Sequence, residues 1–517
     1  MYYSLISSMK RLSDAENFIM AAGITDNTQK LAINNLVDDL KLYGLWTKMK
    51  AIYPFVGGNS FSHKFNLKDP RDLNAAFRLT FNGGGTHSLN GYFPNGTNAY
   101  AETYLNPNSI LTKPFIGYYS RTNANTATDQ IDMGAIAGVG LWISAWYNAS
   151  GFSNFLGRNS SNAVLLIGSA ITDSRAWFWT NKVVNTAKLG INTSIVNSSS
   201  DTSLPPNINL YIGANNYNNV AGGYTNRECA FSLLADGLTD TDTSNLYILI
   251  QKFQTTLGRH VGVPIVSDLD AQAFLNAAFI NDITQANAIN TLVISLKSAG
   301  LWTKMKAIYP FVGGTAFTHK WNLKDPRDLA AAYILNYVGG VTHDSNGINF
   351  NGTNAYAETN LNPTLHLTTP SHLSYYTRTN ANTNTDQIDL GTIDFWLSLW
   401  YKGSGFNNML GRNQNTAVLL DGGVVTDSRG FGLVTKISNN AKLFKNGIQK
   451  DSKTDTVTTY NNATIPIGAF SVNASIKLYY TNRQSAFASI GAGLTDTEAA
   501  NYYTAVQTFQ TTLGRQV

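Results

Sequence analysis

Apolar residues recur at helical spacing near the start of the chain. Between residues 26 and 43 they fall at positions i, i+3, i+4 and i+7 and so share one face of a helix: Ile33, Leu36, Val37 and Leu40. Thr25 is a candidate N-cap for this helix, and Gly44 follows its expected end. A shorter helix is predicted over residues 14–22.

The pattern changes after these helices. Residues 60–235 and 316–491 contain short runs of aromatic and β-branched residues, separated by clusters of Asn, Gly, Asp and Ser. Such runs predict strands joined by turns, and their frequent spacing favours an antiparallel sandwich or jelly roll over a parallel sheet. A closing helix is predicted to begin at Thr239 with a capping pattern and to carry an apolar stripe as far as Leu257.

The whole pattern occurs twice. The stretch GLWTKMKAIYPFVGG at residues 44–58 recurs unchanged at residues 300–314, an offset of 256. A period of this length indicates a duplicated domain and not a solenoid of short repeats. The predicted order is a tail, a helical module, a β-sandwich with its closing helix, a linker, and a second module and sandwich: 1–13, 14–58, 59–260, 261–269, 270–314 and 315–517.

Composition narrows the class of protein. Of the 517 residues, 43% are hydrophobic and 13% are charged. This content supports a buried core and excludes both a wholly disordered chain and a long coiled coil. The net charge of +5 is spread without a dense basic block, so nucleic acid is not an expected partner. Cys229 is the single cysteine, which excludes an internal disulfide.

Two absences in the sequence bear on location. The N-terminal residues lack the charged and apolar regions of a signal peptide. No apolar run is long enough to span a bilayer. We therefore expect a protein that folds in a cytoplasm and does not insert into a membrane.

Several stretches of the β region resemble laminin-G-like and concanavalin A-like jelly-roll domains. They are INFNGTNAYAE at 348–358, AKLFKNGIQK at 441–450, LYIGA at 210–214 and AFSLLADGLTDTD at 230–242. The resemblance implies a mainly β chain with helical additions. Each concanavalin A-like β-sandwich is then preceded by a small helical module and closed by a C-terminal helix.

The helical lead and the AIYPFVGG element at 51–58 are similar to repetitive virion proteins of tailed bacteriophages. This resemblance implies a non-enzymatic structural protein, such as a head or tail fibre or decoration component. Its location would be the virion, assembled in the host bacterial cytoplasm. Its partners would be other virion proteins and further copies of itself.

Two alternatives remain open at this point. The chain could be an adhesin that binds host-surface polysaccharide, or a polysaccharide-degrading enzyme. Glycoside hydrolysis usually needs two carboxyl groups at a set separation. The chain has only five glutamates, of which Glu102 and Glu358 match between the copies, and no E-x-D-x-x-E strand. We therefore expect no enzymatic activity.

Polar loops supply the candidate ligand-facing residues. The RTNANT loops contain the candidate glycan-facing amides Asn123, Asn125, Asn380 and Asn382, which could equally serve as turn formers. Aromatic side chains stack on sugar rings, but the alternation around Trp142, Trp146 and Tyr147 favours the sandwich core for them.

Two aspartates in each copy form a candidate calcium site, because calcium prefers oxygen ligands on loops. They are Asp129 and Asp132 in the first copy and Asp386 and Asp389 in the second. No other cofactor is expected. The paired histidines at 63 and 87, and at 319 and 343, do not form a zinc motif and are expected in a loop or in the core.

The unchanged GLWTKMKAIYPFVGG stretch yields a candidate docking surface for other virion chains. Its residues are Trp46, Lys48, Lys50 and Tyr53, with the counterparts Trp302, Lys304, Lys306 and Tyr309. The alternative is that these side chains only seat the helices on the sandwich.

Overall fold

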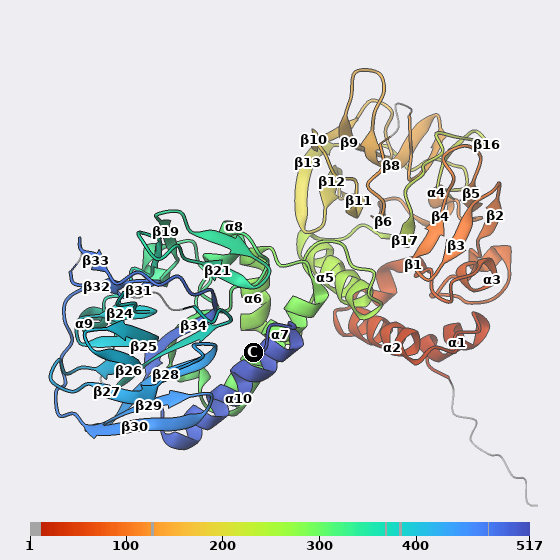
Figure 1. Ribbon diagram of the computed structural model, residues 1–517. Helices are drawn as coiled ribbons and strands as arrows, with labels where there is room; N and C mark the ends of the chain where they lie inside the picture. The colour runs from red at the N-terminus through yellow and green to blue at the C-terminus, as the bar shows by residue number, and fades with distance from the viewer. Residues whose placement is uncertain (1–11, 126–128, 368–369, 382–384, 474) are drawn as a thin grey trace, which may run out of the picture. The chain divides into compact units, whose positions relative to one another are not determined.

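The computed structural model describes residues 12–125, 129–367, 370–381, 385–473 and 475–517 (Figure 1). The chain divides into two compact units, Met1–Val261 and Gly262–Val517. Each unit contains two sheets packed face to face, and a group of helices covers one of them. The prediction of a mainly β chain with helical additions, built from tandem jelly-roll β-sandwiches, is confirmed.

The sheet beneath the helices, here called the helix-side sheet, has eight strands in the first unit. Its strand order is β13-β12-β11-β6-β17-β4-β3, with β1 also paired to β17. The strands are β1 (Met49–Tyr53), β3 (Thr86–Ser88), β4 (Gly91–Phe93), β6 (Pro114–Ser120), β11 (Ala176–Val183), β12 (Thr186–Ile191), β13 (Ser194–Ser200) and β17 (Cys229–Asp236).

The opposite sheet, here called the far sheet, has nine strands in the order β10-β9-β8-β7-β14-β5-β2, with β15 also paired to β7 and β16 paired to β15. The pairing of β15 with β7 is parallel. The strands are β2 (Thr80–Asn82), β5 (Tyr100–Glu102), β7 (Met133–Ala137), β8 (Val139–Tyr147), β9 (Asn154–Asn159), β10 (Leu166–Ala170), β14 (Tyr211–Ile212), β15 (Asn215–Tyr217) and β16 (Val220–Gly222).

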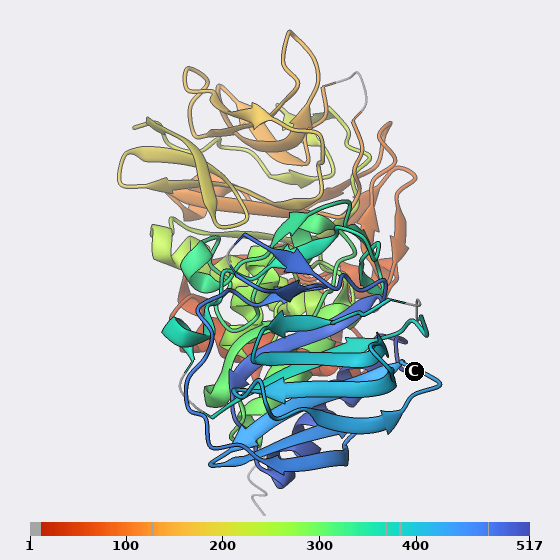
Figure 2. The same cartoon turned by 60° about the vertical axis from the view of Figure 1, so that its left-hand side comes forward.

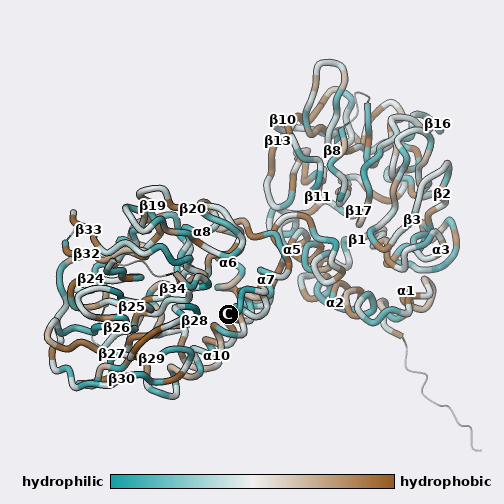
Figure 3. Tube along the Cα trace, viewed as in Figure 1, coloured by the Kyte–Doolittle hydropathy of each residue, from teal (hydrophilic) through white to brown (hydrophobic). Residues whose placement is uncertain are grey.

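Alternate residues of strand β6 belong to two different hydrophobic layers. Ile116 and Tyr118 point into the core between the two sheets, whereas Phe115 and Tyr119 point to the helices. This is the two-residue period of a strand, and every residue of β6 is buried because both faces are covered. The hydropathy colouring of Figure 3 shows hydrophobic and hydrophilic residues interspersed along the chain.

The helices of the first unit are α1 (Asp14–Ala21), α2 (Asn27–Leu42), α3 (Ser60–His63), α4 (Pro107–Ile110) and α5 (Asp240–Thr256), with 3-10 turns η1 (Trp46–Lys48) and η2 (Asn74–Ala76). The predicted apolar stripe of α2 packs with α5 against Trp177, Trp179 and Phe231 of the helix-side sheet. Each unit is therefore a three-layer body of helices, sheet and sheet.

The predicted helix boundaries are close to the observed ones. The side chain of Asp26 caps α2 by accepting a hydrogen bond from the backbone of Gln29 at 2.8 Å, so the cap lies one residue after Thr25. Thr239 caps α5 as predicted, in a reciprocal capping box with Asp242.

The second unit repeats this plan, and Figure 2 shows its strands side by side. Its helices are α6 (Leu269–Ala278), α7 (Ile283–Ser298), α8 (Ala316–His319), α9 (Pro363–His366) and α10 (Asp496–Thr512), with η3 (Trp302–Lys304) and η4 (Ala330–Ala332). Its helix-side sheet contains β18 (Met305–Tyr309), β20 (Thr342–Asp344), β21 (Gly347–Asn349), β23 (Ser371–Thr377), β28 (Gly430–Ile437), β29 (Asn440–Lys445), β30 (Ile448–Thr454) and β34 (Ser485–Ala492). Its far sheet contains β19 (Asn336–Val338), β22 (Tyr356–Glu358), β24 (Leu390–Thr392), β25 (Phe395–Gly403), β26 (Phe406–Asn413), β27 (Leu420–Val424), β31 (Pro466–Ile467), β32 (Phe470–Ser471) and β33 (Lys477–Leu478).

None of the helices in the described residues has both the length and the apolar character needed to cross a membrane.

One buried arginine after the closing helix joins the layers of each unit. Arg259 is 2% exposed and donates to the carbonyl oxygens of Phe55 at 2.7 Å and Ala230 at 3.0 Å. Arg515 makes the equivalent bonds in the second unit, to Phe311 at 2.8 Å and Ala486 at 3.2 Å. Each guanidinium thus ties the closing helix to the helix-side sheet and to the segment that follows β1 or β18.

We expect Arg259→Met to destabilise the first unit by about 3 kcal/mol, because several buried carbonyl groups lose a charged donor. Differential scanning calorimetry would show this as a lower unfolding temperature for one part of the transition. The matched variant Arg515→Met should act in the same way on the second unit.

Arg71→Ala is the control for this experiment, because Arg71 forms an exposed ion pair with Asp69, and exposed ion pairs contribute little to stability. Unchanged unfolding temperatures in both methionine variants would contradict the clamping role of the two arginines.

Candidate functional site

A fully buried ion pair lies beneath the RTNANT loop of each unit. In the first unit Arg227 and Asp132 are both 0% exposed, with Nε 2.8 Å from Oδ1 and Nη2 3.0 Å from Oδ2. Thr225 donates its hydroxyl to Oδ1 at 2.7 Å, and the backbone of Ala145 donates to Oδ2 at 2.5 Å. Both carboxylate oxygens are therefore satisfied, which a buried charge requires.

The same guanidinium holds the loop in place. Arg227 donates from Nη1 to the carbonyl of Ala124 at 3.0 Å and to Oε1 of Gln130 at 2.9 Å. In the second unit Arg483 pairs with Asp389 at 2.8 Å and donates to the carbonyl of Ala381 at 3.2 Å. In both units a buried arginine thus holds the RTNANT loop in place beside the far sheet.

This network changes the interpretation of the candidate calcium aspartates. Asp132 and Asp389 accept hydrogen bonds from an arginine, and the positive charge of that arginine compensates the carboxylate. Asp129 is exposed, and Asp386 accepts a hydrogen bond from Tyr401 at 2.6 Å. Within the described residues no three His, Cys, Asp or Glu side chains gather to hold a metal. Calcium binding stays a prediction that these contacts do not favour.

Two of the predicted glycan-facing amides, those of Asn123 and Asn380, are engaged within the chain. The side chain of Asn123 accepts from the backbone of Ser174 at 3.0 Å, and Asn380 accepts from Ser428 at 3.1 Å. These bonds tether the RTNANT loop to the strand entry of β11 or β28, which is a structural role. Asn125 has a buried Oδ1 without a partner, and Asn382 lies outside the described residues.

The prediction of a docking surface is wrong for Tyr53 and Tyr309. Tyr53 and Tyr309 are 1% and 0% exposed and lie in the core between the sheets. Each donates its hydroxyl at 2.7 Å to a carbonyl, that of Phe77 or Tyr333. The cause is that their segments form strands β1 and β18, which pair with β17 and β34 inside the helix-side sheets.

The lysines and tryptophans of this set face the helices and neighbouring loops. Lys48 pairs with Asp242 of α5 at 2.6 Å, Lys304 with Glu498 of α10 at 2.6 Å, and Lys50 with Asp236 at 2.9 Å. Trp46, Trp302 and Lys306 form cation–π contacts: Lys68 is 4.1 Å from the Trp46 ring, Lys324 is 4.2 Å from the Trp302 ring, and Lys306 is 5.5 Å from the Tyr333 ring. These contacts support the alternative interpretation, in which the residues hold the helices against the sandwich.

A small aromatic cluster, here called the rim cluster, lies on the outer side of each far sheet. In the first unit it comprises Trp142, Tyr147, Phe152 and Asp129, apart from the core between the sheets. The ring centroids of Trp142 and Tyr147 are 6.2 Å apart, and those of Tyr147 and Phe152 are 6.4 Å apart. Burial raises the pKa of Tyr147 to about 12, and the hydrogen-bonded Asp129 carboxylate adds to this.

The second unit has the same rim cluster. It comprises Trp396, Tyr401, Phe406 and Asp386. The centroid distances are 6.0 Å for Trp396 and Tyr401 and 6.3 Å for Tyr401 and Phe406. Burial, followed by the Asp386 carboxylate, raises the pKa of Tyr401 well above its usual value.

The sequence interpretation that these aromatics belong to the sandwich core is wrong for Trp142 and Tyr147. Trp142 alternates with the core residues Leu141 and Ile143, so it faces outward. An irregularity in the register between Ser144 and Tyr147 then brings Tyr147 to the outer side as well. Simple alternation could not reveal this shift.

Exposed apolar residues extend each rim cluster. Tyr217 is 38% and Val220 67% exposed on the β15–β16 hairpin, which pairs beside β7. In the second unit Tyr479 is 38% exposed, and its ring lies 5.6 Å from Phe470, which packs on the cluster. The result is a partly exposed aromatic surface with one carboxylate in each unit.

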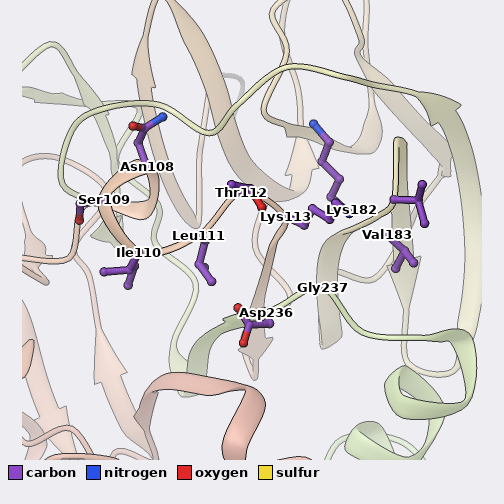
Figure 4. A pocket seen from close by; sticks show the side chains of 11 residues that line it. Asn108, Ser109, Ile110, Leu111, Thr112, Lys113, Lys182, Val183, Asp236 and Gly237 are labelled. Atoms are coloured by element: carbon purple, nitrogen blue, oxygen red, sulfur yellow. The ribbon is translucent and has the colours of Figure 1, made fainter.

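A separate cavity of about 570 Å³ lies in the first unit (Figure 4). Its lining comes from the loop around α4 and from the ends of β11 and β17: Asn108, Ser109, Ile110, Leu111, Thr112, Lys113, Lys182, Val183, Val184, Asp236 and Gly237. Figure 4 shows the Lys182 side chain directed away from Asp236. Its ammonium group pairs with Asp201 at 3.1 Å, so it is not available to a ligand.

The structure also brings two histidines together in each unit. The Nδ1 atoms of His63 and His87 are 2.9 Å apart, and those of His319 and His343 are 3.1 Å apart. Such a bond needs one protonated and one unprotonated Nδ1, so it excludes a pair in which both rings are cationic. Burial, then His87 and Arg259, lowers the pKa of His63 to about 2, and burial lowers that of His87 to about 4.

Comparison with known proteins leaves the family open. No family model matches the chain, and no curated protein matches it. Among solved structures, domains LG4-5 of the mouse laminin alpha1 chain share 11% identity over 74% of this chain and 81% of that chain, with a TM-score of 0.20.

Two other structures cover different shares of the chain. Domain 4 of AbnA, a GH43 extracellular arabinanase from Geobacillus stearothermophilus solved with arabinotriose, shares 17% identity over 38% of this chain and 98% of that chain, with a TM-score of 0.25. A structure described as showing that cell entry of botulinum neurotoxin type C depends on two ganglioside molecules shares 9% identity over 88% and 96%, with a TM-score of 0.32. Because these TM-scores are low, the fold assignment rests on the strand order of this chain. The virion role stays a prediction.

We expect the first unit to lose stability as the pH falls. The folded pKa of His63 lies below its usual value of 6.5, so the unfolded chain binds a proton that the folded chain does not. The contribution is complete above about pH 6.5 and falls by about 3 kcal/mol between pH 7 and pH 4. Urea titrations over this range would measure it.

The variant His63→Phe separates this effect from the titration of carboxylates. Its stability should depend less steeply on pH than that of the unmodified chain between pH 6.5 and pH 4. Equal slopes would show that His63 does not contribute.

Proposed function

We propose that the chain is a non-catalytic glycan-binding protein that uses its two rim clusters to bind sugar rings. The observation that carries this proposal is the matched arrangement of aromatic rings and one carboxylate on the outer side of both far sheets. Aromatic faces pack against the apolar faces of sugars, and carboxylate and amide groups accept hydrogen bonds from their hydroxyls.

The positions of the carboxylates support binding over hydrolysis. Each rim cluster contributes one carboxylate, whereas glycoside hydrolysis by the common route uses two. The matched glutamates have other contacts: Glu358 pairs with Lys477 at 3.3 Å, and Glu102 accepts from the backbone of Tyr104 at 2.9 Å.

Two sites on one chain would strengthen attachment to a repeating polysaccharide. Once one rim cluster is bound, the other searches a small volume, so the combined affinity exceeds that of either site. This favours a densely glycosylated surface as the target over a free sugar.

The predicted virion setting is compatible with this chemistry. We propose that, as a fibre or decoration component, the chain would attach a particle to host-surface polysaccharide while contacting other virion proteins and copies of itself. Quantitative mass spectrometry of purified particles tests the virion location. Absence of the chain from particles would contradict that location and would leave the glycan-binding proposal unaffected.

Replacing the central tyrosines tests the binding proposal. We expect Tyr147→Ala or Tyr401→Ala each to weaken one site about tenfold, equivalent to about 1.4 kcal/mol. The double variant should lose most binding to immobilised polysaccharide, because both sites and their combined affinity are lost. Surface plasmon resonance on immobilised cell-surface polysaccharides would measure this.

Phe61→Ala and Phe317→Ala are the matched controls, since these aromatic residues are 55% and 51% exposed but lie on α3 and α8. Circular dichroism would verify that all variants fold. Binding by the folded double variant at the strength of the unmodified chain would exclude the rim clusters as the site.

A further inference from the structure

An arginine lies opposite the tryptophan of each rim cluster. In the first unit Arg158 of β9 is the cross-strand partner of Trp142 on β8. In the second unit Arg412 of β26 is the partner of Trp396 on β25. Directly opposite residues of an antiparallel pair place their side chains on the same face of the sheet. The two arginines, here called the rim arginines, therefore lie on the outer side of the far sheets with the tryptophans.

Each rim arginine packs beside its tryptophan. The guanidinium carbon of Arg412 is 5.8 Å from the centroid of the Trp396 ring. In the first unit a Cβ added at Gly140 would lie 3.3 Å from Cδ of Arg158 and 3.3 Å from Cδ1 of Trp142, so these two side chains border the same space. Each rim cluster therefore has a planar cation next to its aromatic rings.

The rim arginines are half-buried, and neither forms an ion pair with a carboxylate in the part of the chain that the structure describes. Nε of Arg412 is buried without a hydrogen-bond partner. Arg158 donates from Nη1 to the carbonyl oxygens of Ser161, at 3.3 Å, and Asn162. A cation that is partly removed from water without a counter-ion carries a desolvation cost, which a bound anion would offset.

The cation and the anion of the rim cluster have different neighbours. In the second unit Asp386 accepts from the hydroxyl of Tyr401 at 2.6 Å. The ring of Tyr401 lies 6.0 Å from that of Trp396, which has Arg412 beside it. The aromatic surface thus has a cation next to its tryptophan and an anion next to its tyrosine. A ligand with one negative group and several hydroxyl groups complements these charges.

From this arrangement we propose that each rim cluster binds a sugar with a carboxylate on its ring, such as a hexuronic acid, and that the rim arginine pairs with this carboxylate. The inference rests on the proposed function, because the sugar ring packs on the rim aromatics. A guanidinium donates two parallel hydrogen bonds to a carboxylate, which a hydroxymethyl group cannot accept in the same way. The hydroxyl groups of the sugar donate to the carboxylate of Asp129 or Asp386.

The two units differ in how far the rim arginine is already engaged. Arg158 donates to two carbonyl groups of its own loop, whereas Nε of Arg412 has no acceptor. A new carboxylate therefore satisfies more of the hydrogen-bonding capacity of Arg412. We expect the second unit to contribute more than the first to the preference for acidic sugars.

Matched acidic and neutral polysaccharides test the proposal on the full chain. The probes are polygalacturonate, alginate and hyaluronate, each beside its carboxyl-reduced form, in which every carboxylate has become a hydroxymethyl group. Surface plasmon resonance should show about tenfold tighter binding to at least one acidic polymer than to its reduced form. The lack of such a preference for all three polymers would overturn the proposal. Equally tight binding of dextran sulfate would also overturn it, because sulfate supplies charge without a ring carboxylate.

Variants assign the preference to the rim arginines. Arg412→Gln should lower the ratio of acidic to neutral affinity more than Arg158→Gln does, and the double variant should abolish the preference. Arg412→Lys should keep only part of it, because an ammonium group lacks the planar fork of a guanidinium.

The double variant Arg71→Gln and Arg327→Gln is the matched control. It removes the same number of positive charges at exposed arginines that pair with Asp69 and Asp325. Circular dichroism would verify that all variants fold. A preference that survives in the folded rim double variant, or that falls equally in the control, would overturn the role of the rim arginines.

The tyrosine variants separate this inference from the proposed function. If the unmodified chain binds acidic and reduced polymers equally, and Tyr147→Ala with Tyr401→Ala weakens both, the rim clusters bind glycans without selecting acids. Only the present inference then fails. If the folded tyrosine double variant binds as tightly as the unmodified chain, the proposed function fails as well.

Discussion

Every charge buried inside the two sandwiches has to be compensated, and this constraint organises much of the structure. Removing one partner of a buried ion pair costs about 3–5 kcal/mol, because the other charge stays without water. Arg227 is compensated by Asp132 and also donates to two further acceptors, the carbonyl of Ala124 and Oε1 of Gln130. Arg259 is compensated by backbone carbonyls. Each of these residues therefore connects segments that are far apart in the sequence.

The same constraint shapes the candidate site. The Asp132 carboxylate is buried and paired with Arg227 below the RTNANT loop. The exposed carboxylate in the rim cluster is therefore that of Asp129. The buried pair holds the loop and the end of β8 in fixed positions, which keeps the aromatic rings of the rim cluster in place. A rigid aromatic surface loses little conformational entropy when a sugar ring binds to it.

The two units show what a duplicated chain keeps and what it changes. The buried arginine–aspartate pairs and the histidine pairs occur in both units with nearly the same distances. One position differs in charge between the units, since Asp394 stands where the first unit has Gly140. The duplicate therefore offers an internal control for each proposal about a single side chain.

The sequence by itself determined the features that depend on neighbouring residues. The spacing of Ile33, Leu36, Val37 and Leu40 placed helix α2, and the capping box at Thr239 placed the start of α5. The repeated stretches revealed the duplication, and the alternation of strands and turns indicated the β-sandwich. These signals are local, because helical and strand periods are set by the backbone over a few residues.

Only the tertiary structure decided which distant side chains meet. Asp132 and Arg227 are 95 residues apart in the chain, so their pairing left no local signal, and the aspartate resembled a calcium ligand. Tyr53 looked available for docking until β1 paired inside the sheet. Tyr147 faces outward because a shift in register breaks the alternation along β8. Burial, charge pairing and register depend on contacts between separate strands, which residue patterns along one strand do not contain.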